Sequence, residues 1–76
     1  MSTGEAPREA FFLFEDTTQV LWAEEVAREE GVPVEVVPAP VESEDLCALA
    51  LRTLPGKVEV LAAFLEEEGI GFRTHP

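Results

Sequence analysis

Few of the side chains that carry covalent chemistry occur in this sequence. Its 76 residues include one cysteine, Cys47, and one histidine, His75. One cysteine cannot form an internal disulfide, and one cysteine with one histidine cannot form a metal site alone. The chain contains neither a nucleophile–base–acid set nor a glycine-rich phosphate loop. We therefore expect no cofactor and no metal, and a reducing cytoplasm as the compartment.

Basic residues are also scarce. Five Lys or Arg stand against 16 Asp or Glu, which gives a formal net charge of −11. Because binding to a phosphate backbone needs a basic patch, we expect no nucleic-acid partner. Anionic membrane surfaces are disfavoured for the same reason. We expect the acidic residues to solubilise the outer helix faces, with docking of a basic protein as the alternative.

Long apolar runs are absent as well. No run of about 18 apolar residues exists, so nothing in the sequence predicts a membrane-spanning helix. Residues 1–9 lack a basic start followed by a long apolar core, so they do not resemble a secretion signal, and we expect a flexible tail there. Asn is absent and Gln occurs once. This bias matches the thermophile pattern of few thermolabile residues, although genomic base composition would produce it too.

The remaining composition is that of a small globular domain, which we assign to residues 10–74. Its hydrophobic content of 46% is normal for a folded chain, and its length is at the small end of what folds alone. We predict strands over residues 11–14, 32–37, 46–53 and 70–74, and helices over 17–30 and 58–68. Asp16 or Thr17 is the expected N-cap of the first helix, and Gly31 and Gly69 are the expected helix ends. The composition of residues 46–53 would also suit a helix, but their short length between turn signals favours a strand.

This order predicts a ferredoxin-like βαββαβ fold of the α+β class, with a four-stranded antiparallel sheet and two helices on one face. Right-handed crossovers put the first and third strands, which are the most apolar, in the middle of the sheet. The strands that contain Pro and Gly then lie at the edges, where their weaker ladders matter least. The open face would expose Phe and Leu side chains, so we expect a homodimer through this face, with an apolar ligand as the alternative.

Four segments resemble the DUF3343 family of selenium/sulfur carrier protein-like sequences. The resemblance spans roughly residues 10–74, and it is carried by residues 14–18, 31–34, 37–40 and 46–51. Its strongest part is the pairing of a Pro-x-Pro turn, Pro38-Ala39-Pro40, with a cysteine that opens an apolar strand. Family members usually have Cys-Gly at that point, whereas this chain has Cys47-Ala48.

The resemblance implies that Cys47 holds sulfur or selenium as a persulfide or selenosulfide. Such a carrier accepts the atom from a donor enzyme and passes it to an acceptor, and it needs an accessible thiol rather than an active site of its own. The structural alternative is a free cysteine used as a small core residue, because free cysteines are often buried. A pair of Cys47 with His75 as base is not expected, since the third and fourth strands are not neighbours in this topology.

Two further functions remain open at the level of sequence. Split βαβ domains such as the ACT-like domains dimerise and bind small metabolites, so a regulatory module is one alternative by fold analogy. A plain interaction subunit, whose acidic surface docks a basic enzyme, is the other.

Overall fold

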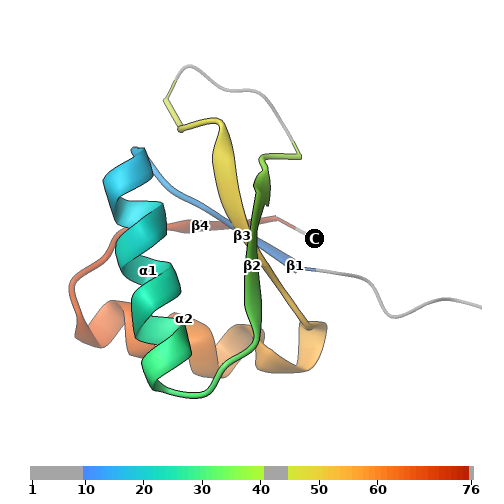
Figure 1. Cartoon of the computed structure of the whole chain (residues 1–76), viewed down its shortest axis with the longest axis vertical. Coiled ribbons are helices and arrows are strands. Elements are labelled where there is room, and N and C mark those ends of the chain that lie inside the picture. The colour runs from blue at the N-terminus through green and yellow to red at the C-terminus, as the bar shows by residue number, and fades with distance from the viewer. Residues whose placement is uncertain (1–9, 41–44, 76) are drawn as a thin grey trace, which may run out of the picture.

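The computed structural model of the chain describes residues 10–40 and 45–75, so the tail predicted over residues 1–9 lies outside it. Along the chain the elements are β1 (Ala10–Leu13), α1 (Thr17–Glu29), β2 (Val34–Pro38), β3 (Leu49–Thr53), a short 3₁₀ turn (Pro55–Lys57), α2 (Val58–Glu67) and β4 (Arg73–His75) (Figure 1). The predicted βαββαβ order is confirmed. Neither described helix is long and apolar enough to span a membrane.

The four strands form one antiparallel sheet in the order β2-β3-β1-β4. Phe12 of β1 lies opposite Leu51 of β3 on one side and Thr74 of β4 on the other. The two most apolar strands therefore occupy the middle of the sheet, as predicted. Figure 1 shows α1 and α2 together on one side of this sheet, which completes a ferredoxin-like α+β fold.

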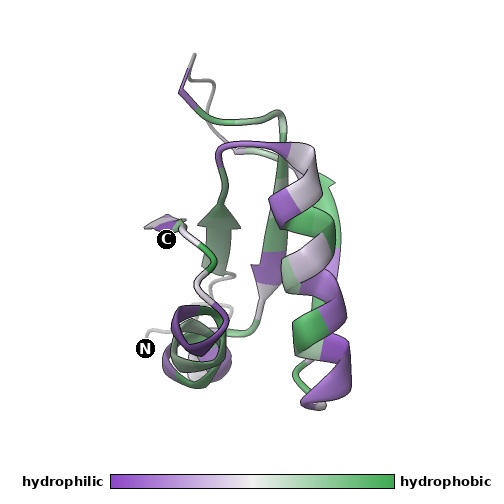
Figure 2. Cartoon of the chain, turned by 90° about the vertical axis from the view of Figure 1, so that its left-hand side faces the viewer, coloured by the Kyte–Doolittle hydropathy of each residue, from purple (hydrophilic) through white to green (hydrophobic). Residues whose placement is uncertain are grey.

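The core lies between the helices and the inner face of the sheet. The central strands contribute Phe12, Phe14 and Leu51, whose side chains are fully buried. One face of α1 is buried against these strands, and α2 adds two buried leucines. The buried helix residues are Val20, Ala23, Val26, Ala27, Leu61 and Leu65. In Figure 2 the strand that leads into α1 is green throughout, whereas both helices alternate between green and purple. This alternation is what an amphipathic helix on a sheet requires.

The helix ends follow the signals in the sequence. Asp16 caps α1, and its carboxylate accepts a hydrogen bond of 2.9 Å from the Gln19 amide. Gly31 and Gly69 have φ values of 76° and 77° just after the two helices. Both are in the left-handed region that a residue with a Cβ adopts only with strain, so glycine is favoured there.

The predicted start of the third strand is wrong. β3 begins at Leu49 rather than at Leu46, because the preceding residues bond to two different partners instead of extending one ladder. The Cys47 amide donates to the Phe14 carbonyl at 2.9 Å, and the Ala48 carbonyl accepts from the Ala39 amide at 2.7 Å. The last ladder pair is Pro38 with Leu49, and proline has no amide hydrogen to donate.

The last strand is also shorter than predicted. β4 covers Arg73–His75, whereas Ile70 turns inward and is 3% exposed. The Ile70 amide donates to the Leu65 carbonyl at 3.0 Å, so this residue closes the end of α2 instead of entering the sheet. Such a bond, together with the positive φ at Gly69, is typical of a helix C-terminal cap.

The open face of the sheet carries both apolar and charged residues, whereas the sequence analysis predicted an apolar face. Directly opposed residues share a face, so Leu13 and Ala50 lie there together with Arg73. Leu13 and Ala50 are buried, although no described helix covers them. Phe11 is half-buried and its ring lies 6.4 Å from that of His75. Charged and aromatic groups therefore share this surface.

Candidate functional site

Cys47 lies in the segment that leads into β3, beside the connection from β1 to α1. Its amide donates a hydrogen bond of 2.9 Å to the carbonyl of Phe14, the residue that directly follows β1. Two segments far apart in the sequence are thereby joined at one end of the sheet. Figure 1 shows the start of α1 and the start of β3 at this same end.

The sulfur of Cys47 is half-buried. Its Sγ–H donates to the Leu49 carbonyl at 3.1 Å, and its side chain packs against the edge of the core. The predicted alternatives were an accessible thiol and a sealed core residue, and the observed exposure lies between them. A thiolate has no proton to donate, so nucleophilic attack by this sulfur requires the bond to Leu49 to open.

The residues predicted to shape the turn lie around this segment. Pro38 ends β2 opposite Leu49, the residue that accepts the thiol hydrogen bond. Ala39 is joined to Ala48 by the 2.7 Å bond described above, whereas Pro40 is exposed and precedes a stretch outside the described residues. The structure therefore brings Ala39 and Ala48 together beside Cys47.

Alanine at position 48 fits the local backbone. Among the described residues, positive φ occurs only at two glycines, Gly31 and Gly69. Ala48 therefore does not need the conformational freedom that a glycine would supply there. Ala48 itself is exposed. Compared with Cys-Gly, the Cys47-Ala48 pair adds a methyl group and makes the local backbone less flexible.

His75 is not brought to Cys47. β1 separates β3 from β4, as the predicted topology requires. His75 pairs with Phe11, near the beginning of β1, whereas Cys47 bonds to Phe14 after its end. Over residues 10–40 and 45–75, no three side chains among His, Cys, Asp and Glu are grouped so that they could hold a metal ion.

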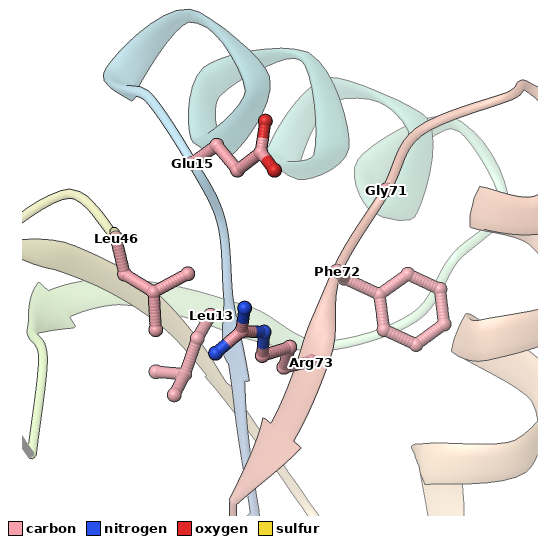
Figure 3. A pocket seen from close by; sticks show the side chains of 6 residues that line it. All are labelled: Leu13, Glu15, Leu46, Gly71, Phe72 and Arg73. Carbon is pink, nitrogen blue, oxygen red and sulfur yellow. The ribbon is translucent and has the colours of Figure 1, made fainter. Parts of the chain in front are cut away.

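A hollow that the sequence analysis did not predict lies next to this segment. It has a volume of about 240 Å³ and is lined by Leu13, Glu15, Leu46, Gly71, Phe72 and Arg73 (Figure 3). Leu46 directly precedes Cys47, and Glu15 directly follows the residue that accepts the Cys47 amide bond. Only the pairing of β1 with β4 brings Arg73 to this place, so no local sequence signal could have identified it.

The comparisons with known proteins point in one direction. The profile of a family described as "Putative Se/S carrier protein-like" matches residues 9–75, which is nearly the whole chain. Searches of curated proteins and of solved structures gave no significant match.

Proposed function

The chain belongs to the Se/S carrier protein-like family, and from this premise we propose that it carries one sulfur or selenium atom on Cys47 between a donor and an acceptor protein. The atom would be held as a persulfide or a selenosulfide. The chain would act as a carrier and leave activation of the atom to its donor enzyme. A free thiol of this kind requires a reducing compartment, such as the cytoplasm.

The proposed loading step is an exchange between a thiol and a persulfide. The Cys47 thiolate attacks the terminal sulfur of a donor persulfide, a new S–S bond forms on Cys47, and the S–S bond within the donor breaks. The donor leaves as a thiolate and takes up the proton that Cys47 released. No electron is gained or lost overall, because the sulfane sulfur moves at a constant oxidation level. Selenium would move by the same step, with Se as the atom attacked.

The observation that supports this proposal is the partial exposure of the only thiol in the sequence. Cys47 is the one cysteine in the chain, and its side chain is half-buried rather than sealed in the core. Within the described part of the chain, the backbone of its segment forms separate hydrogen bonds, from Cys47 to Phe14 and from Ala39 to Ala48, and not a continuous ladder. Opening of such a segment needs far less free energy than global unfolding. A donor could therefore reach the sulfur without unfolding the chain.

Mass spectrometry of the protein purified from its own cells without reductant tests the proposal. We expect an adduct on Cys47 equal in mass to one sulfur or one selenium atom, which dithiothreitol removes. Incubation of the purified protein with a persulfide donor should regenerate the adduct, and the Cys47→Ser variant should stay unmodified. A thiol that stays unmodified in both experiments, and that alkylates only after denaturation, would leave Cys47 with a structural role.

For the end of the open sheet face around Phe11 and His75, the partner that we propose is a second copy of the chain. The four strands contain a single acidic residue, Glu35, which pairs with Arg52 on that face. Acidic residues outnumber basic ones on the two helices, whose exposed acidic residues are Glu25, Glu29, Glu59, Glu66 and Glu67. Packing two sheets face to face would keep these acidic layers apart. A basic donor or acceptor protein would then approach the helical side.

A further inference from the structure

The hollow beside β1 and β4 has opposite charges on its walls. Glu15 contributes a carboxylate and Arg73 a guanidinium, and both side chains are exposed. In Figure 3 the Glu15 side chain extends from the chain after β1 toward the segment that contains Gly71, and the Arg73 side chain runs from that segment back across β1, toward Leu13 and Leu46. Leu13 and the half-buried Leu46 supply apolar surface, whereas the ring of Phe72 packs on Phe12.

Arg73 differs from the other described arginines in its partners. Arg28 pairs with Glu24 at 3.0 Å, and Arg52 pairs with Glu35 across two strands. Over the described residues, the side chain of Arg73 forms no ion pair, although Glu15 lines the same hollow. Both charges are thus available to a molecule that enters between them.

We infer that this hollow binds a small zwitterion with an apolar side chain, namely a free α-amino acid. Its carboxylate would pair with Arg73, its ammonium group with Glu15, and its side chain would lie against Leu13 and Leu46. A simple anion would meet Glu15 and a chain with net charge −11, and a simple cation would meet Arg73. Only a molecule that carries both charges can pair with both Glu15 and Arg73. This inference does not depend on any chemistry at Cys47.

The size of the hollow agrees with such a ligand. Its volume of about 240 Å³ is below the range of roughly 300–1,000 Å³ that is common for drug-sized ligands. Because the charged groups are exposed and the site is shallow, we expect a dissociation constant in the millimolar range, about 1–10 mM.

Titration of the full ¹⁵N-labelled chain with L-leucine tests this inference by NMR. We expect saturable shifts of the amide signals of Leu46, Gly71 and Arg73. The matched probes are 3-methylbutylamine, which lacks the carboxylate, and 4-methylpentanoic acid, which lacks the amine. Each should bind about tenfold more weakly than L-leucine or worse, because one charged hydrogen bond is missing. Equal binding of either probe, or no saturable shift with L-leucine, would overturn the inference.

Two pairs of charge variants test which residues form the site. Arg73→Gln and Glu15→Gln should each weaken L-leucine binding by about tenfold or more. The controls Arg28→Gln and Glu25→Gln make the same changes of charge on α1 and should leave binding unchanged. Binding that falls equally in the control variants would mean that only net charge matters, and it would contradict the site.

A steric block is a further test that removes no charge. Gly71 lines the hollow, and a Cβ added there would meet no atom within 4 Å. Gly71→Leu should therefore fold normally and abolish L-leucine binding by filling the space. The matched control is Gly56→Leu, since a Cβ at Gly56 also meets nothing within 4 Å and this glycine is not part of the hollow. Unchanged binding in a folded Gly71→Leu variant would refute the proposed location.

Discussion

The amide of Cys47 donates a hydrogen bond of 2.9 Å to the carbonyl of Phe14, and this bond ties the candidate carrier thiol to the end of β1. Phe14 is fully buried, and Asp16, two residues later, caps α1. The backbone of Cys47 is therefore joined to the connection between β1 and α1. The thiol group forms a weaker hydrogen bond than the amide does, because S–H is a weak donor, and its acceptor is the Leu49 carbonyl.

The cap of α1 should contribute measurably to stability. Asp16→Ala removes the acceptor for the Gln19 amide, and we expect the free energy of unfolding to fall by about 0.5–2 kcal/mol. Asp16→Asn removes the charge but keeps a capping oxygen, so its loss should be smaller. Urea denaturation of the two variants measures both values. Equal losses would indicate that the charge, and not the cap, stabilises this helix.

A hydroxyl group links β3 to the chain before β2. Thr53 is 4% exposed, and its Oγ1 donates to the Pro33 carbonyl at 2.8 Å. Thr53→Val keeps the shape but leaves that carbonyl without this donor, so we expect a loss of about 1 kcal/mol in the free energy of unfolding. The control is Thr74→Val at an exposed position of β4, which should change stability little. A Thr53→Val protein as stable as the parent chain would contradict this account.

The fold was predictable from sequence because its signals are local and agree with one another. Asp16 and Gly31 bound α1, and the stripe from Val20 to Ala27 identifies its buried side. The apolar runs identify the two central strands. The strand boundaries were less predictable, because Cys47 and Ile70 are placed by long-range or capping hydrogen bonds. Neither bond can be predicted from the local residue pattern.

The site was predictable only in part, for a related reason. The single cysteine and its turn residues are visible in the sequence, but the half-buried state of the sulfur depends on the bond to Leu49 and on packing against the core. The hollow was missed because Glu15 and Arg73 meet only through the pairing of β1 with β4. Topology had to be known before these charges could be placed together.

Self-association through the open sheet face should be sensitive to a charge placed on that face. Phe11 is half-buried there beside His75, and Phe11→Glu should shift the proposed dimer to monomer in light scattering at micromolar protein concentration. Leu21→Glu is the control, because Leu21 is 52% exposed on α1, and it should leave the molar mass unchanged. A monomeric parent chain, or dissociation by the control alone, would exclude this interface.

The residue after the cysteine should control how often the thiol becomes accessible. Ala48 is exposed, and its carbonyl accepts the bond from Ala39 that holds the segment beside β2. Ala48→Gly gives the unfolded or opened segment more conformational freedom, so we expect it to favour local opening by about 0.4–1 kcal/mol. That is roughly a two- to fivefold faster alkylation of Cys47 by iodoacetamide. Ala63→Gly, at an exposed position of α2, should lower global stability by a similar amount without this effect. If both variants accelerated alkylation equally, the thiol would react only through global unfolding, and the segment around Ala48 would have no gating role.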